Sequence, residues 1–277
     1  MKRASINDLW VQLVILNFII FLFANIFKNL GIGFFTEYFA MPIYLTEFVP
    51  KFWTILTYQF LHQSLGHVFN NMILLYIFGH LAQSFFGRTT LLSLYIIGGF
   101  FAAFTVFLSV PFYDYSSTAI LLGASGSIFA ITVAVAVFAP DYILNLFILG
   151  TVKIKWVALV LVIIGTIIDF SYNVGGTIAH IGGIIFGYMF GKQMQQFNNI
   201  LRPVNNLIDK TGLIKKSKTL KKHFKTKKPH KYPTIQPTHT LPKQFKLDQI
   251  LDKISKTGLD SLTEDEKTYL ERQSHNS

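Results

Sequence analysis

The sequence predicts an all-α integral membrane protein, a bundle of six transmembrane helices followed by a cytoplasmic tail. Hydrophobic residues make up 51% of the 277 residues and charged residues only 14%, about half of the usual share in soluble domains. The mean hydropathy is +0.43. The chain has no Cys, which excludes disulfides, thiolate metal sites and a Cys nucleophile.

The net charge of +11 is concentrated in the last third of the chain. Residues 1–191 carry seven Lys or Arg and six Asp or Glu, whereas residues 192–277 carry eighteen and eight. The first part is thus a nearly neutral, apolar body that would not dissolve in water. We therefore divide the chain into a membrane domain over residues 1–191 and a basic tail.

Six apolar stretches in the membrane domain are candidates for transmembrane helices. Each needs roughly 20 mostly apolar residues, or fewer where the helix is buried in protein or begins below the surface. The first stretch is too long for a cleaved signal peptide and has no small-residue cleavage site before a soluble domain. The predicted spans are 9–29, 66–86, 89–110, 124–139, 154–170 and 176–190.

The distribution of Lys and Arg over the short loops predicts the orientation, because cytoplasmic loops carry an excess of these residues. With the N-terminus inside, the inner loops hold Arg88, Lys153 and Lys155 as well as the basic tail. The outer loops hold only Lys28 and Lys51. We therefore expect both termini to be cytoplasmic, in a protein of the cell (inner) membrane.

The long first outer loop, about residues 30–65, contains ten aromatic residues between Gly31 and Phe60. Amphipathic rings favour the interface between water and lipid. We expect this loop to lie in the outer headgroup region, and an ordinary packed loop is the alternative.

Three predicted spans carry polar side chains near their N-terminal ends, where a polar group in lipid needs a partner or a function. His67 and Asn71 lie one turn apart on the second span, Ser125 begins the fourth, and His180 lies early in the sixth. Even-numbered spans run in the same direction, so these ends share one side of the membrane. Counting the helical rise from the inner surface places Ser125 and His180 at depths that agree within about one turn.

The fourth and sixth spans also carry small residues at four-residue spacing, which allows helix backbones to approach closely in lipid. These stripes are Gly126, Ala130 and Ala134 on the fourth span, and Ala179, Gly183, Gly187 and Gly191 on the sixth. Packing the two stripes together would bring Ser125 beside His180. Generic packing of membrane helices gives the same pattern, and both interpretations can hold at once.

The residue types indicate the chemistry of such a pair. A Ser hydroxyl becomes a good nucleophile when an adjacent base takes its proton, and His is the best base near neutral pH. The oxyanion that develops needs fixed donors, which His67, Asn71 and the backbone N–H of Ser125 could supply. A His in a membrane span can also act as a proton relay or a ligand, so the pair alone does not decide the function.

The joint pattern resembles the rhomboid family of intramembrane serine proteases. The resemblance covers residues 1–191, with the same order of motifs and number of helices. Its motifs are the lead-in WTILTYQFLH at residues 53–62, His67-x-x-x-Asn71, Gly123-x-Ser125-Gly126 and Ala179-His180-x-Gly182-Gly183.

This resemblance implies a catalytic dyad without a third acid, in which Ser125 is the nucleophile and His180 the general base. It places His67, Asn71 and the backbone N–H of Ser125 in oxyanion-stabilising positions. Supporting positions implied by the same motifs are Gly123, Gly126, Phe129 and Gly183. Phe129 matches an aromatic position, often Tyr, that packs on the catalytic His.

The function expected from these residues is that of an endopeptidase that cuts transmembrane proteins near the outer membrane face. The expected partners are such substrates and membrane lipids, with no cofactor. No metal is expected, since His62 and His67 are five residues apart and do not share a helix face. The alternative is a catalytically silent rhomboid-like protein that binds transmembrane helices for trafficking or quality control.

The tail is predicted to have two parts. Residues 192–244 have the composition of a flexible basic linker, with nine Lys within residues 215–231 that would attract anionic lipid headgroups. Nucleic-acid binding is not expected, because no aromatic residues alternate with the charges. Residues 245–277 show helical spacing and a capping box, which predicts a short helical hairpin like the one at the C-terminus of many bacterial rhomboids, with a role that the sequence leaves open.

Overall fold

The computed structural model describes residues 5–116, 118–146, 150–170, 173–196, 199–212, 214 and 263–264. The chain divides into two units, Met1–His223 and Phe224–Ser277. Almost all described residues belong to the first unit. The predicted hairpin at 245–277 and most of the predicted basic linker lie outside the described residues.

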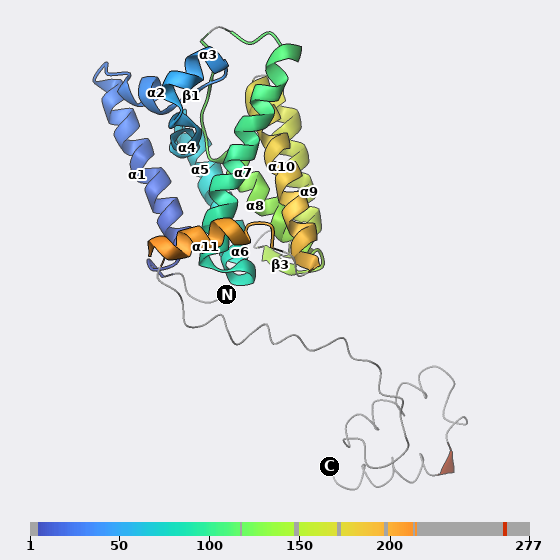
Figure 1. Cartoon of the computed structure of the whole chain (residues 1–277). Helices are drawn as coiled ribbons and strands as arrows, with labels where there is room; N and C mark the ends of the chain where they lie inside the picture. Colours follow the sequence, from blue (N-terminus) through green and yellow to red (C-terminus); the bar gives the residue numbers. More distant parts are fainter. Residues whose placement is uncertain are drawn as a thin grey trace. The chain divides into compact units, whose positions relative to one another are not determined.

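Helices occupy the six stretches in which transmembrane segments are predicted (Figure 1). They are α1 (Leu9–Asn29); α5 (Leu65–Leu74), continued by a π-helical turn η3 (Leu75–Gly79) and α6 (His80–Phe86); α7 (Arg88–Ser109); α8 (Ser125–Phe138); α9 (Ile154–Phe170); and α10 (Val174–Gln195). Four of the stretches are long and apolar enough to cross a membrane, whereas α8 and residues Ile154–Thr166 of α9 form shorter apolar helices. The chain is a mostly helical integral membrane protein, while the count of six spans and the orientation of the termini stay predictions.

Polar caps and a glycine set several helix boundaries. Ser64 Oγ accepts the backbone N–H of His67 at 3.2 Å and so caps α5. Asn173 Oδ1 accepts the N–H of Gly176 at 2.9 Å at the start of α10. Gly87 has φ +90°, a conformation that suits glycine, and it separates α6 from α7.

The loop that is predicted to be the first outer loop folds into short elements at one end of the bundle (Figure 1). They are α2 (Phe34–Phe39), β1 (Met41–Pro42), α3 (Leu45–Phe48), η1 (Val49–Lys51), α4 (Thr54–Thr57) and η2 (Tyr58–Phe60). Rings such as Phe34 and Tyr38 are exposed, as an interfacial loop requires. Tyr58 differs: it is buried, and its hydroxyl donates to the carbonyl of Gly99 on α7 at 2.7 Å. The loop is thus also a packed part of the domain.

Two small antiparallel sheets correct the all-α prediction. Strand β1 pairs with β2 (Ile120–Leu121), which joins the first loop to the segment before α8. Strands β3 (Ile143–Leu146) and β4 (Gly150–Lys153) form a hairpin between α8 and α9. The β-branched Thr151 and Val152 favour such a strand. A prediction made from long apolar stretches does not detect such short strands.

A second correction concerns the start of the linker, which was expected at residue 192. Helix α10 continues to Gln195, and a further helix, α11 (Arg202–Thr211), packs on the start of α7. Asn205 accepts a hydrogen bond from Ser93 at 2.6 Å, and Thr89 donates to Asp209 at 2.9 Å. The polar side chains of α11 give it the composition of a linker, but in the structure they bind hydroxyl groups of α7.

Helix α8 lies at the centre of the bundle. All its residues from Gly126 to Ala136 are buried, as expected of a helix that is apolar on every face. Its neighbours include α7, where a Cβ on Gly98 would come within 2.6 Å of the Cβ of Ala130. Because neighbouring helices hold α8 on several sides, the position of Ser125 at its first turn is closely fixed.

Candidate active site

The small residues of α8 and α10 pack directly against each other. A Cβ added to Gly183 would overlap the carbonyl oxygen of Gly126, and one added to Gly187 would overlap that of Ala130. A Cβ on Gly191 would lie 2.8 Å from the carbonyl oxygen of Ala134. Backbone therefore touches backbone over two helical turns, which is the contact expected from the two stripes.

This crossing brings Ser125 and His180 together. Ser125 Oγ lies 2.8 Å from Nε2 of His180, and His180 is only 4% exposed. The other ring nitrogen, Nδ1, lies 3.1 Å from the backbone carbonyl oxygen of Gly165 on α9. A carbonyl oxygen can only accept, so Nδ1 carries the hydrogen and the lone pair of Nε2 faces the Ser hydroxyl. This tautomer is the one that a general base requires.

Gly165 is a residue that the sequence reasoning did not find. A Cβ at this position would overlap the ring of Phe129, so glycine allows α9 to come close to that ring. The ring centroid of Phe129 lies 4.6 Å from that of His180, and the two planes are inclined by 39°. The only sequence signal for Gly165 is that it is a single Gly within the apolar run VLVIIGTII.

The other side of Ser125 is formed by residues before α8 and on α5. Gly123 has φ +125°, and a Cβ there would lie 2.9 Å from Cε1 of His67 and 3.7 Å from Ser125 Oγ. The His67 ring, Gly123 and the Ser125 hydroxyl are therefore close neighbours. Ser125 is also the first residue of α8, where backbone N–H groups lack partners within the helix.

Asn71 lies on α5, which contacts α8, and it is buried. Its Nδ2 donates to the carbonyl oxygen of His67 at 3.0 Å. A side-chain amide has two N–H donors, so this bond orients the group and uses one of them. The structure places Asn71 one turn beyond His67 on the helix that borders the site, and its role toward an oxyanion stays a prediction.

Comparison with known families decides the family of the chain. The Rhomboid domain family matches residues 49–196, which is more than half of the chain and includes every candidate site residue. The protein belongs to the rhomboid family. A second match, to a family of unknown function (DUF6576), covers residues 241–276. No individual curated protein matches the sequence.

The rhomboid domain contains a buried polar network next to Ser125 that the sequence reasoning also missed. Gln59 is fully buried, and its Oε1 accepts the hydroxyl of Ser127 at 3.0 Å. Its Nε2 donates to the carbonyl of Ile55 at 3.1 Å, and its own carbonyl accepts the hydroxyl of Tyr95 at 3.0 Å. This network connects the loop before α5 with α7 and with the first turn of α8.

Among the residues that the structure describes, no group of three or more His, Asp or Glu could hold a metal ion. The rings of His62 and His67 lie 5.1 Å apart in the rhomboid domain. Burial lowers the pKa of His62 to about 3, and the neighbouring His67 adds to the effect. His62 is therefore neutral at physiological pH, and we interpret it as a packing partner of the His67 ring.

Proposed function

We propose that this rhomboid protein is an intramembrane serine endopeptidase that hydrolyses peptide bonds of transmembrane proteins. The observation that carries this proposal is the hydrogen bond between Ser125 Oγ and His180 Nε2, together with the bond that fixes the His180 tautomer. An inner-membrane location, with the C-terminal tail in the cytoplasm, is part of the proposal. No nucleic acid or cofactor is involved.

In the first step, Ser125 Oγ attacks the carbonyl carbon of the scissile bond while Nε2 of His180 takes the hydroxyl proton. The imidazolium that forms is stabilised by its Nδ1–H, which donates to the carbonyl of Gly165. Here a backbone carbonyl orients the base, as a carboxylate does in a triad. The ring of Phe129 packs against the imidazole and limits its rotation.

The negative charge on the substrate oxygen requires donors on the opposite side of Ser125 Oγ. The backbone N–H of Ser125 at the start of α8, the ring of His67 and the second amide hydrogen of Asn71 are the available groups. When the tetrahedral intermediate collapses, His180 returns its proton to the leaving amine. Water then attacks the carbonyl carbon of the acyl-enzyme while Nε2 of His180 takes a proton from the water. His180 returns this proton to Ser125 Oγ when the acyl group leaves.

The positions of the charges support a site that faces the outer side. Ser125 and His180 lie at the ends of α8 and α10 nearer to α2, α3 and α4 (Figure 1). Arg88, Lys153 and Lys192 belong to the opposite ends of the bundle, near α6, β4 and the last turn of α10. Cations favour the cytoplasmic side, so the site would open toward the outer leaflet.

The family resemblance further implies a cut near the outer end of a substrate helix, at a small residue followed by a stretch that weakens the helix. The physical reason is that a hydrogen-bonded helix hides its carbonyl groups from a nucleophile. Local unwinding must come first, and Gly or Pro reduces its cost. A substrate whose cut region contains only Leu and Ala should therefore be cleaved more slowly.

The test is cleavage of a single-span substrate by the purified full chain, combined with labelling by a fluorophosphonate, which reacts with activated serines. Ser125→Ala and His180→Ala should each abolish both signals, and the double variant should be no worse because the two residues act as a unit. Ser84→Ala, at an exposed Ser on α6, is the matched control and should behave as wild type. Cleavage that persists in pure Ser125→Ala protein would show that the nucleophile is wrong. Binding of the substrate without cleavage or labelling in the wild type would favour the silent rhomboid-like alternative.

A further inference from the structure

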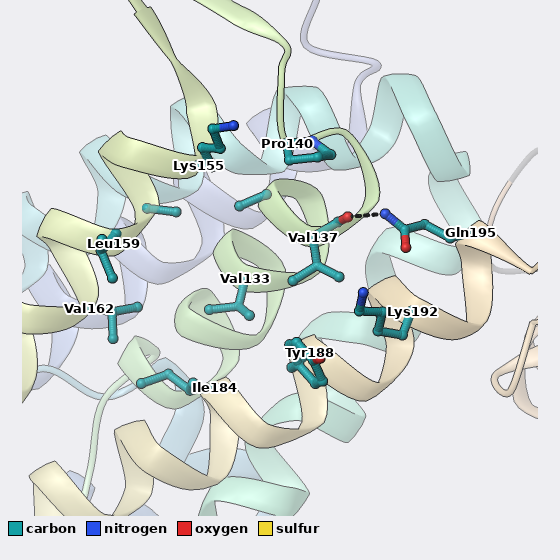
Figure 2. Close-up of a pocket in the computed structure, with 12 residues that line it drawn as sticks. Val133, Val137, Pro140, Lys155, Leu159, Val162, Ile184, Tyr188, Lys192 and Gln195 are labelled. Carbon is teal, nitrogen blue, oxygen red and sulfur yellow. Dashed lines mark hydrogen bonds between the residues drawn. The ribbon is translucent and has the colours of Figure 1, made fainter.

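The halves of α8, α9 and α10 away from Ser125 line an open apolar cleft with a volume of about 390 Å³ (Figure 2). This volume falls within the range of about 300–1,000 Å³ that is usual for small-molecule sites. The cleft lies far from Ser125 along α8, and its walls include Val133, Val137, Leu159, Val162, Ile184 and Tyr188.

The cleft exists because α9 contacts its neighbours unevenly. At Gly165 it comes close enough for its carbonyl to bind His180. About two turns earlier, Ala158 lines the cleft together with Ala136 of α8, and these short side chains do not fill the space between the helices. The larger Leu159 is about half exposed at the edge. The result is an open cleft between the helices.

One end of the cleft is cationic. Lys155 and Lys192 line it there, beside Pro140 and Gln195 (Figure 2). Lys155 Nζ lies 3.0 Å from Asp141 Oδ1, and that carboxylate also binds Lys153 Nζ at 3.0 Å. The three lysines therefore exceed the one carboxylate that pairs with them, and the rim keeps a positive charge. The Gln195 side chain donates to the Val137 carbonyl and closes the end of α8.

The length of the cleft matches one leaflet. From Ile184 to Gln195, α10 rises by about 16 Å, roughly half of a hydrocarbon core of about 30 Å. An acyl chain is one methylene wide and suits a narrow apolar cleft.

We infer that this cleft binds one acyl chain of an anionic phospholipid of the inner leaflet, with the phosphate of the headgroup between Lys155 and Lys192. The apolar wall binds the chain, and the cationic rim selects the headgroup. Each Lys near a membrane surface strengthens binding of an anionic lipid by about fivefold. The pair should therefore favour an anionic over a zwitterionic lipid by about tenfold or more.

The first test is a direct binding measurement on the full chain in detergent, by native mass spectrometry, with phosphatidylglycerol and phosphatidylcholine as probes. Wild type should prefer phosphatidylglycerol, and the Lys155→Gln/Lys192→Gln double variant should bind both lipids equally. Lys51→Gln is the matched control, because Lys51 belongs to the loop at the other end of the bundle. A double variant that keeps the full preference would overturn the inference.

A second test fills the cleft and does not depend on charge. Ala158→Phe should reduce the binding of both lipids at least tenfold. Val160→Phe, on the outward face of the same helix, where Val160 is 52% exposed, should leave binding unchanged. Unchanged binding in Ala158→Phe would overturn the inference, as would competition by glycerol phosphate, which lacks acyl chains, at the potency of the whole lipid. These readouts measure binding alone, so they stand or fall independently of the proposed protease activity.

Discussion

Helix α9 packs differently on α8 and α10 in its two halves, whereas α8 and α10 stay in backbone contact from Gly126 to Ala134. We call the half with Ser125 and His180 the outer half and the opposite half the inner half, after the proposed orientation. In the outer half, Gly126, Gly165 and Gly183 allow backbones and rings to touch, and His180 reaches Ser125 there. In the inner half, Ala136 and Ala158 line an open cleft. The geometry of the Ser125–His180 pair thus depends on glycine where α9 and α10 approach it, whereas α9 leaves an open cleft beside Ala136 and Ala158 in the inner half. A methyl group added in the two halves should have very different effects.

The largest effect is expected at the crossing of α8 and α10. In Gly183→Ala, the new methyl group would overlap the carbonyl of Gly126, so the helices must move apart. We expect cleavage to fall by about 10²-fold or more, since a shift of about 1 Å at a catalytic pair has such a cost. Gly33→Ala is the matched control, because a Cβ on Gly33 meets nothing within 4 Å. Equal activity of the two variants would contradict the importance of the crossing.

The next effect concerns the oxyanion side of the outer half. Asn71→Ala should lower kcat by roughly 10²-fold and leave KM nearly unchanged, because an oxyanion donor acts mainly in the transition state. The substitution also removes the bond from Asn71 to the His67 carbonyl, so thermal unfolding should be measured in parallel. Unchanged turnover in a folded protein would remove Asn71 from the site.

A smaller loss, about tenfold in kcat, is expected from Gly165→Ala. Its methyl group would overlap the Phe129 ring and push the α9 carbonyl away from Nδ1 of His180. Because the damage acts through Phe129, the double variant Gly165→Ala/Phe129→Leu should recover part of the loss. The matched change in the inner half is Ala158→Val, at a residue that lines the cleft, and it should leave kcat unchanged. If the second substitution brings no recovery, the two residues are not coupled as we propose.

The smallest effect is expected at α11, on the side of the bundle away from the site. Truncation after Ile214 should not change activity or unfolding. Truncation after Leu201 removes α11 and its hydrogen bonds to Thr89, Thr90 and Ser93. It should lower the free energy of unfolding by about 2–3 kcal/mol, since each bond contributes about 1 kcal/mol. Equal thermal stability of the two truncated proteins would show that α11 docks without stabilising the domain.

The sequence predicts the helical stretches well and singles out Ser125 and His180, which the structure brings within hydrogen-bond distance, because both kinds of signal are local. The roles of the site residues stay predictions. Long apolar runs give the helices, and polar residues such as Ser125 and His180 stand out within them. The stripes of small residues even indicate which helices pack together. What the sequence does not show is which backbone group binds Nδ1 of His180, because every residue has the same carbonyl.

The other missed features also depend on distant partners. Gln59 has no neighbour in the sequence that reveals its contact with Ser127, 68 residues away. Helix α11 has the composition of a soluble linker, and its partners on α7 lie more than a hundred residues earlier. The cleft lies between residues of α8, α9 and α10 that are far apart in the sequence. Such properties emerge from packing and leave no local pattern of hydropathy.

The carbonyl of Gly165 has a consequence for how the proposed protease responds to acid and to mutation. A peptide carbonyl does not titrate in the physiological range, so acidification cannot release the ring of His180 from its acceptor as protonation of a carboxylate partner could. The acceptor is also present in every amino acid, so no side-chain replacement can delete it. The contact between His180 Nδ1 and this carbonyl therefore changes only when the backbone of α9 or α10 moves.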